Sequence, residues 1–542
     1  MKYNNPRRSI YLPIIIAVSV SLGIIAGLLL PGNKSGILST SIRPKYDKIP
    51  TLLNIINSSY VDTVNIPELE ESAISTVLKN LDPHSIYIPA KDMKRANEPL
   101  RGNFEGIGIT FNLLTDTILV ISTIPGGPSE KAGLMAGDKI IYVNDSLVAG
   151  VGITEDGAMG MLRGPRGTVV KVKVLRKGSA GLIPFEITRD KIPLHTVDVA
   201  YMINNSTGYI KINNFALNTH NEFTEALKDL KNQGLRSLIL DLRGNAGGVM
   251  DPAIKIANQF LKKGQLIVYT QGRAFPRSEA RATGNGLFEE GELVVLIDEY
   301  TASASEILAG AIQDNDRGTI IGRRSFGKGL VQEPITFSDG SGLRLTVARY
   351  YTPTGRSIQR PYNQGNDKYY EELAKRFERG GESFRNALED TSLFKNLPKY
   401  KTAGGKTVYG GGGIIPDIFI PIDTTGISDY FIKVRDYFII TRFALRYTEN
   451  YRETLQKFTS VKELENYLDQ QQLLNKFVQF AAENGVKRDP EGIKTSGKII
   501  EIQVKAYIAR NILDNKGFYP IWEKLDTTLK FAIEYLTEKE KH

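Results

Sequence analysis

The chain has 542 residues, of which 41% are hydrophobic and 24% charged, as in folded globular proteins rather than disordered or fibrous ones. Single hydrophobic cores stop growing well below this length, so we expect several domains. The net charge of +9 is spread along the chain, which argues against nucleic acid as a partner. The absence of cysteine excludes disulfides, thiolate zinc sites and a cysteine nucleophile.

Residues 1–35 predict a membrane anchor or an export signal. Lys2, Arg7 and Arg8 precede an uncharged stretch, residues 9–33, that is rich in Ile, Leu and Val. We expect an uncleaved anchor, because no small-x-small cleavage site follows the apolar run; a removed signal peptide is the alternative. The basic flank keeps the amino terminus cytoplasmic, so the remaining chain should lie outside the inner membrane.

The next two regions of the chain differ in the spacing of their apolar residues. Residues 36–98 carry apolar side chains at helical spacing and predict a helical region. Residues 99–190 contain short β-type runs separated by Gly, Pro and Asn or Asp, which predicts a compact β-rich domain. Its strands are expected at residues 118–121, 140–143 and 169–174.

Residues 191–426 predict a layered α/β core, because strand-like runs alternate with helical ones. Strands are expected at 237–242, 293–298 and 319–321, and helices at 222–230 and 305–313. Within this core, residues 361–405 are charged and Gly-rich, as in a surface insertion. Residues 427–542 predict a separate helical domain, with amphipathic helices at 430–458, 461–482 and 499–513.

Ser303 is the candidate nucleophile. It follows a buried-type strand through a tight turn and stands at the start of a helix, among small residues that let a substrate backbone approach. Unpaired N–H groups at such a helix start, including that of Ala304, can stabilise an oxyanion. The alternative is that Ser303 or Ser305 only caps the helix, with acidic Glu306 in its first turn.

A serine nucleophile needs a base, and Lys328 is the candidate. None of the four histidines, His84, His195, His220 and His542, lies in a recognisable catalytic setting. A lysine can act instead if burial lowers its pKa toward neutrality. Lys328 lies between two glycines, and in an extended chain Gln332 shares its face and can orient the amine.

The residues around Lys328 have a rival interpretation as a phosphate-binding loop. Residues 322–328 match that motif up to its last position, which requires Ser or Thr. Residue 329 is glycine, so the hydroxyl that binds magnesium is absent, and no long helix is expected next. Nucleotide binding is therefore disfavoured.

A Gly-rich turn after the strand at 237–242 is a second candidate site element. The turn, residues 243–248, precedes a helix near Pro252. It can be only a tight connection, but it can also bring the N–H of Gly247 or Gly248 opposite that of Ala304 as an oxyanion hole.

These motifs together resemble the C-terminal processing peptidases, or tail-specific proteases. The similarity lies in residues 301–306 and 326–329, which resemble the nucleophile and base segments of that family, and in 81–85, 241–248, 351–359 and 413–417. The resemblance covers about residues 50–425 and selects Ser303 as nucleophile. Two positions depart from the usual pattern, Thr301 in place of serine and Ala246 in place of glycine or proline.

Residues 100–190 resemble the PDZ domain of that family. The resemblance implies that Gly106, Ile107, Gly108 and Ile109 form the loop that binds a terminal carboxylate. It also implies that Arg163 links the PDZ domain to the protease. Asp314 matches a family position linked to activity, but 11 residues of helix put it about 16 Å along the axis from Ser303, so we expect a structural role.

The fold expected is a multidomain α/β protein with an inserted PDZ domain and helical regions at both ends. The function expected is a serine endopeptidase of the cell envelope that uses a Ser303–Lys328 dyad on proteins with exposed C-terminal tails. The alternative is a non-catalytic PDZ adaptor that binds tails. No metal or cofactor is implied; membrane contact is expected through the amino terminus, and a homo-oligomer or an adaptor protein stays open.

Overall fold

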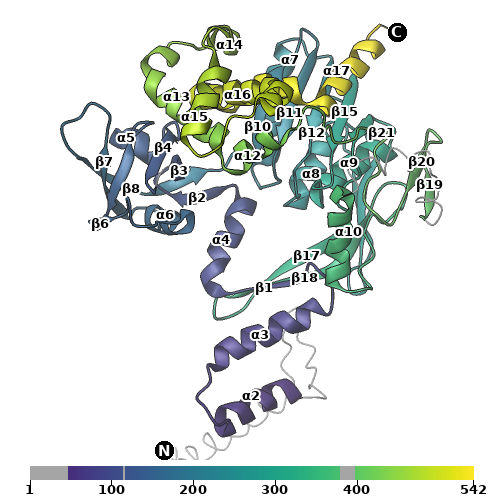
Figure 1. Ribbon diagram of the computed structural model, residues 1–542. Helices are drawn as coiled ribbons and strands as arrows, with labels where there is room; N and C mark the ends of the chain where they lie inside the picture. The colour runs from purple at the N-terminus through teal and green to yellow at the C-terminus, as the bar shows by residue number, and fades with distance from the viewer. Residues whose placement is uncertain (1–46, 114–115, 379–396, 542) are drawn as a thin grey trace, which may run out of the picture. The chain divides into compact units, whose positions relative to one another are not determined.

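The computed structural model describes residues 47–113, 116–378 and 397–541, and the chain divides into two compact units, Met1–Ser72 and Ala73–His542 (Figure 1). The first unit contains α2 (Lys48–Ser59), which buries no side chain, and the beginning of α3 (Ile66–Lys79). The expected membrane segment, residues 1–35, lies outside the described residues. Across the described ranges, no helix is both long and apolar enough to cross a bilayer.

The β-rich domain contains a sheet in which β3, β4, β5, β7 and β8 are neighbours and β6 pairs with β5. Its residues Ile118, Ile140 and Val172 are almost fully buried. A separate antiparallel pair, β2 with β9, joins the two ends of the domain, as an inserted domain requires. The elements are β2 (Asn103–Gly106), β3 (Ile109–Leu113), β4 (Ile118–Thr123), α5 (Pro128–Ala132), β5 (Lys139–Val143), β6 (Ser146–Leu147), α6 (Glu155–Leu162), β7 (Val169–Leu175), β8 (Ile183–Thr188) and β9 (Asp190–Pro193).

The core domain is built on a six-stranded sheet in the order β10-β11-β12-β15-β16-β21. The strands from β11 onward are parallel, and β10 is antiparallel to β11. The five strands and helices expected in this core form within three residues of their predicted ends. The elements are β10 (Val197–Met202), β11 (Thr207–Ile212), α7 (Thr219–Asn232), β12 (Ser237–Asp241), α8 (Met250–Ala257), β15 (Glu292–Ile297), α9 (Ala304–Asp314), β16 (Thr319–Gly322) and β21 (Ile418–Phe419).

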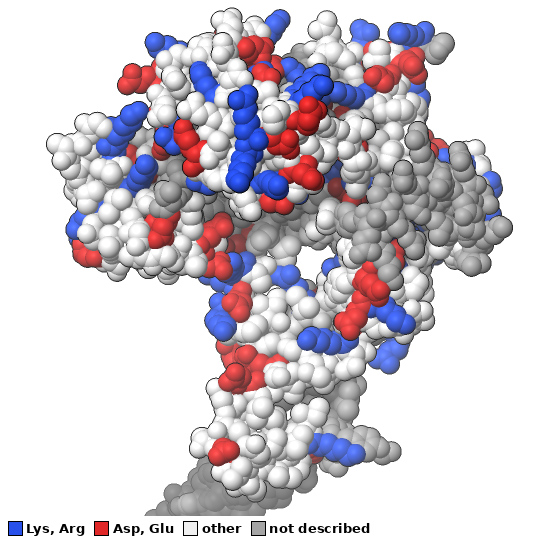
Figure 2. Space-filling view, in the orientation of Figure 1, with Lys and Arg blue, Asp and Glu red and all other residues white. Residues whose placement is uncertain are grey.

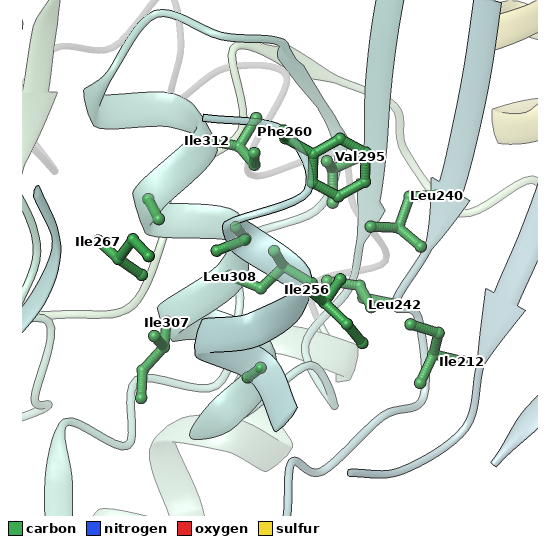
Figure 3. Close-up of a cluster of buried hydrophobic side chains, with 14 of the residues drawn as sticks. Ile212, Leu240, Leu242, Ile256, Phe260, Ile267, Val295, Ile307, Leu308 and Ile312 are labelled. Carbon is green, nitrogen blue, oxygen red and sulfur yellow. The ribbon is translucent and has the colours of Figure 1, made fainter. Parts of the chain in front are cut away.

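Helices cover both faces of this sheet, because alternate residues of a strand point to opposite sides. On one face Leu240 and Val295 pack with Ile256 of α8 and Leu308 of α9, as Figure 3 shows. On the other face the intervening residues of β12 and β15 pack against α17 (Thr527–Lys539). The result is a three-layer core, which confirms the expected fold class.

A second, antiparallel sheet borders the core, in the order β1-β18-β13-β14 with β17 on β18. Its strands are β1 (Ile86–Ile88), β13 (Leu266–Gln271), β14 (Ser278–Arg281), β17 (Leu330–Thr336) and β18 (Gly342–Tyr351). The sequence predicted no strand at β1, because three residues between helical patterns carry no periodicity. Strand β1 leads into α4 (Ala90–Arg101).

Residues 361–405, expected as a surface insertion, include α10 (Asn366–Glu378) and β19 (Lys399–Lys401), which pairs with β20 (Thr407–Tyr409). Helix α10 is not wholly on the surface, because Tyr369 is 3% exposed and its ring packs edge-on against that of Phe326. The high charge of the segment gave no indication that Tyr369 would be buried.

The C-terminal helices have a hydrophobic core of their own, which includes Phe443, Phe477 and Ile500. The long helix α16 is interrupted at Leu513 and Asp514, where the backbone leaves the helical region. On the face shown in Figure 2, acidic and basic side chains are interspersed. The helices are α12 (Asp429–Asp436), α13 (Ile439–Leu455), α14 (Val461–Asp469), α15 (Leu473–Glu483), α16 (Pro490–Trp522) and α17, with a 3₁₀ turn η3 (Glu523–Leu525).

Candidate active site

Three segments singled out from the sequence lie at the carboxyl ends of parallel strands in the core sheet. Residues 242–248 follow β12, residues 298–303 follow β15, and residues 323–329 follow β16. These strands are direct neighbours in the sheet. The carboxyl edge of an open α/β sheet is where ligands bind, so the segments share the expected position of an active site.

Ser303 stands on a strained turn directly before α9. Its φ of 56° and ψ of −116° are rare for a residue with a side chain. The turn is held from the β12 loop, since the Thr301 hydroxyl donates to the carbonyl of Leu242 at 2.9 Å and the Ala302 N–H donates to that of Asn245 at 3.0 Å. Strain of this kind recurs at functional sites, where the surrounding structure maintains it.

Ser305 has a different environment from Ser303. Its hydroxyl is fully buried and donates to the carbonyl of Asn245 at 3.0 Å. This bond fastens the start of α9 to the β12 loop. Of the two serines, Ser305 therefore has the geometry of a packing residue.

The carboxylate of Glu306 joins the serine turn to the lysine segment. Its Oε2 accepts the N–H of Ser303 at 2.8 Å and that of Lys328 at 2.9 Å. Its Oε1 accepts the Ser325 hydroxyl at 2.5 Å and the Gly327 N–H at 2.7 Å. Burial raises the pKa of Glu306, although these four donors favour the carboxylate. The sequence indicated only a first-turn acid here, because the partners of Glu306 lie up to 22 residues away.

Tyr350 of β18 forms a second link between the same two segments. Its buried hydroxyl lies 3.0 Å from the carbonyl oxygen of Ser303 and 2.7 Å from that of Lys328. A hydroxyl has one hydrogen, so it donates to one carbonyl at a time. Burial raises the pKa of Tyr350 far above its usual value, so the hydroxyl keeps its proton. No sequence pattern marked this tyrosine.

The amine of Lys328 has the environment that a general base requires. Its Nζ donates to Oε1 of Gln332 at 2.9 Å, and no carboxylate within the described ranges forms an ion pair with it. Burial, followed by the nearby charge of Arg344, lowers the pKa of Lys328. The amine is therefore neutral in a larger share of molecules than an exposed lysine would be, and a neutral amine can accept a proton.

Gln332 is held in turn by the segment before β1. Its Nε2 donates to the carbonyl of His84 at 2.5 Å, so one amide bonds both the lysine and this segment. The two-residue period predicted that Lys328 and Gln332 share a face, and the contact forms despite an irregularity in β17 between Val331 and Gln332. The ring of His84 bonds the Tyr369 hydroxyl at 2.9 Å rather than Ser303. Burial and then Lys328 lower the pKa of His84 to about 4, so the ring is neutral at neutral pH.

The oxyanion candidates differ in which N–H groups are available. The N–H of Gly247, a predicted oxyanion donor, donates to the side chain of Asn245 at 2.9 Å. In the described part of the chain, no acceptor takes the N–H of Gly248 or of Ala304. Gly247 instead provides room, because a Cβ on it would lie 2.8 Å from the Cβ of Ser303 and 2.9 Å from the N of Ala304.

The expected PDZ loop connects β2 to β3. Ile107 is 2% exposed, and Gly108 has φ of 73° with its carbonyl accepting the N–H of Ile124 at 3.0 Å. Arg163, expected to link this domain to the protease, donates to Glu98 of α4 at 2.6 Å. Its guanidinium also lies 4.5 Å from the ring centroid of Phe104. Arg163 therefore contacts the helix that precedes the domain.

Asp314 does not reach the serine turn. Its carboxylate pairs with Arg356 at 2.6 Å, with both side chains fully buried, and accepts the Thr354 hydroxyl at 2.7 Å. These contacts fasten the end of α9 to residues 352–356. Among the described residues, no group of His, Asp and Glu side chains is arranged to hold a metal ion.

Comparisons with known proteins show to which families parts of this chain are similar. The model of peptidase family S41 matches residues 206–365, that of the PDZ domain matches 99–175, and that of a family of unknown function (DUF8443) matches 430–514. The carboxy-terminal processing protease CtpA of Bacillus subtilis (strain 168) is 35% identical over 64% of this chain and 73% of its own length. The carboxy-terminal-processing protease of Bartonella bacilliformis is 38% identical over 56% and 70%, respectively.

A solved structure, the photosystem II D1 C-terminal processing protease, is 30% identical, with a TM-score of 0.33, and covers 57% of this chain and 83% of its own. The family models and the curated relatives define the protein as a serine-type peptidase that carries a PDZ domain. The chain belongs to the carboxy-terminal processing proteases of peptidase family S41.

Proposed function

We propose that this chain is a serine endopeptidase of the cell envelope that cleaves proteins with exposed C-terminal tails, with Ser303 as nucleophile and Lys328 as general base. The observation that carries the proposal is the state of the Lys328 amine. It is partly buried, its pKa is lowered, and it bonds the neutral amide of Gln332 instead of a carboxylate. A structural lysine would normally be paired with an acid when buried.

The reaction proceeds by way of an acyl-enzyme. Nζ of Lys328 takes the proton of the Ser303 hydroxyl as Oγ bonds to the carbonyl carbon of the substrate. Collapse of the tetrahedral intermediate breaks the C–N bond, and the ammonium returns its proton to the leaving amine. A water, deprotonated by the same amine, then attacks the acyl carbon and releases Ser303.

The oxyanion of the intermediate is stabilised by the N–H groups of Gly248 and Ala304. Both belong to segments at the carboxyl edge of the core sheet, and neither N–H is used within the described structure. Loss of one such donor in other enzymes lowers kcat by about 10²–10³. Gln332 orients the amine and has no part in proton transfer.

The PDZ domain binds the C-terminal tail of the substrate. The turn at Gly108 and the loop at residues 106–109 support this assignment, because PDZ loops hold a terminal carboxylate with backbone N–H groups while the tail adds as a strand. Peptides that end in a free carboxylate should show lower KM than the same peptides with an amidated end. Equal KM values for the two peptides would contradict tail recognition.

The location in the envelope rests on residues 1–35 of the sequence. A basic start followed by an uncharged apolar stretch is typical of an anchor or an export signal. Protease added to spheroplasts should digest the catalytic domain. Protection of that domain until the inner membrane is lysed would contradict an envelope location.

The central test is covalent labelling with a fluorophosphonate probe that reacts with activated serines. Mass spectrometry should find the probe on Ser303 in the wild type and in Ser305→Ala, a matched control two residues away. Ser303→Ala and Lys328→Ala should take up no probe and cleave no unstructured peptide. Peptide cleavage by Ser303→Ala would contradict the assignment, and a wild type that binds tails without labelling or cleavage would instead be a PDZ adaptor.

A further inference from the structure

The C-terminal residues after Asp514 pack against the core domain. After the break at Asp514, α16 lies along β10, where Asn515 donates to Asp198 at 2.6 Å and Tyr519 also bonds Asp198. Residues 515–542 lie beyond the segments that the three family models match. This C-terminal extension therefore belongs structurally to the protease core.

The last helix covers the face of the core sheet opposite α8 and α9. Leu529, Ala532 and Leu536 of α17 are fully or almost fully buried against Ile239 of β12 and Val294 of β15. Without α17, the apolar side chains of Ile239, Val294 and Leu296 on this face would be exposed to water. This apolar packing explains why α17 lies on the sheet. It does not explain why the acidic residues Asp526 and Glu540 flank the helix.

The two ends of α17 contact opposite ends of β12. At the end of the helix, Glu540 accepts the hydroxyl of Ser237, the first residue of β12, at 2.8 Å. At its start, Asp526 caps the helix and accepts two hydrogen bonds from Arg243, at 2.9 and 2.6 Å. Only the second contact lies at the carboxyl edge, where the candidate active site is.

Arg243 lies between two carboxylates. Its guanidinium also bonds Asp241 at 2.6 Å, and its carbonyl accepts Nζ of Lys211 at 2.9 Å. Burial alone would lower the pKa of Arg243, but Asp241 and Asp526 raise it above its usual value. Two oxygens of Asp526 on one planar guanidinium fix both the position and the orientation of this side chain.

Arg243 begins the loop that carries the oxyanion donor. The next residue, Gly244, donates to Asp298 at 3.0 Å, and Asn245 receives the bonds from Ala302 and Ser305 that hold the serine turn. A displacement at Arg243 would therefore reach both the Gly248 N–H and Ser303. The path from Asp526 to Ser303 passes through Arg243, along the backbone to Asn245, and across a hydrogen bond to Ala302.

From these contacts we infer that Asp526 is a positioning residue for catalysis, and that the C-terminal extension sets the geometry of the oxyanion loop through Arg243. The inference rests on the proposed function, because it assumes that Gly248 and Ser303 act in catalysis. Asp526 touches neither substrate nor reacting atoms, so its effect should appear in the rate of acylation rather than in substrate binding.

The test compares Asp526→Asn with Glu540→Ala in the full-length protein. Asparagine caps helices as well as aspartate does, so the cap on α17 is kept. The amide replaces the acceptor of the 2.6 Å bond by a donor that faces Arg243. The control removes the carboxylate contact at the other end of the same helix, away from the site.

For Asp526→Asn we expect kcat and the rate of fluorophosphonate labelling to fall by about tenfold to a hundredfold, less than the loss of a whole oxyanion donor. KM should stay within about twofold of the wild type, and Asp526→Glu should recover part of the rate, because it restores the charge. Glu540→Ala should keep the wild-type kcat while losing a comparable amount of thermal stability.

Wild-type kcat in Asp526→Asn would overturn the inference, as would equal losses of kcat in Asp526→Asn and Glu540→Ala. If Asp526→Asn lowers Tm strongly, kcat is measured well below the Tm of both variants, and an unchanged rate there again overturns the inference. Failure of the proposed function is distinguishable, because the wild type itself would then take up no probe at Ser303.

Discussion

Lys328 donates its backbone N–H to Oε2 of Glu306 at 2.9 Å, and the same oxygen accepts the N–H of Ser303 at 2.8 Å. The proposed base and nucleophile are therefore held by one buried atom of a side chain that takes no part in the chemistry. Tyr350 bonds the carbonyls of the same two residues. The backbone geometry of the dyad is thus fixed from both the N–H and the carbonyl side.

Replacing Glu306 with glutamine should lower kcat by tenfold or more, on the order of the cost of leaving buried N–H groups without an acceptor. Glutamine offers one acceptor oxygen, whereas four donors face the carboxylate. The charge of Glu306 also raises the pKa of Lys328, against the lowering by burial. The variant's pH–rate profile should therefore have its midpoint at lower pH than the wild type.

Ser325→Ala is the control for this prediction, because it removes one donor to Glu306 and leaves the charge in place. Its midpoint should match the wild type. If Glu306→Gln lost activity with an unshifted midpoint, the effect would be explained by disturbed packing, and the electrostatic link to Lys328 would be rejected.

Replacing Tyr350 with phenylalanine should reduce kcat about tenfold while changing KM little, since the loss of one buried hydrogen bond is worth about 1–3 kcal/mol. The ring stays in the core, so the fold should be retained. The control is Tyr351→Phe, the next residue of β18, whose ring stacks on Tyr269. Similar kcat values for Tyr350→Phe and the wild type would show that the Glu306 contacts alone hold the two segments.

Replacing Gly247 with alanine should abolish measurable turnover, because the new Cβ would lie 2.6 Å from the Ala302 carbonyl and 2.8 Å from the Cβ of Ser303. The control is Gly244→Ala in the same loop. Both glycines have positive φ, 94° and 74°, but a Cβ on Gly244 would meet nothing within 4 Å. An alanine at either position would be strained by the positive φ. The difference in kcat between the two variants therefore measures the steric displacement of Ser303.

The sequence predicted the parts of the site that depend on local order. The strand before Ser303, the helix after it and the shared face of Lys328 and Gln332 all follow from patterns of fewer than about 12 residues. Glu306 and Tyr350 were missed as links, because they join loops that lie 19 to 47 residues away along the chain.

The bond made by the N–H of Gly247 was missed for a related reason. A glycine turn after a strand predicts available N–H groups, but the Asn245 side chain, two residues earlier, accepts this one. The contact between Asp526 and Arg243 spans 283 residues, and no local pattern carries such information. Sequence periodicity specifies elements and faces, whereas these contacts depend on how distant elements pack.

A further prediction concerns the protonation of Lys328. Activity should rise with pH along one limb, with a midpoint below the ~10.4 of a free lysine, because burial disfavours the ammonium. His84 should add no limb above pH 5, since its pKa is about 4. Lys328→Arg should be inactive at every pH, because guanidinium cannot act as a base in this range. Near wild-type turnover by this variant would assign the lysine an electrostatic role and require another base.

The same shift predicts the pH dependence of stability. The folded-state pKa of Lys328 lies below its unfolded value, so its contribution to the free energy of unfolding is full above the unfolded pKa and is lost as pH falls through the folded one. Lys328→Met removes the amine and keeps its length, so the variant should be inactive yet have a higher Tm than the wild type at pH 6. That gain should shrink as pH rises from the folded-state pKa of Lys328 toward its unfolded-state pKa, because the unfolded chain then binds fewer extra protons. If the Tm difference between Lys328→Met and the wild type stayed constant with pH, the pKa of Lys328 would not be shifted. The assignment of Lys328 as the base would then have no support from its pKa.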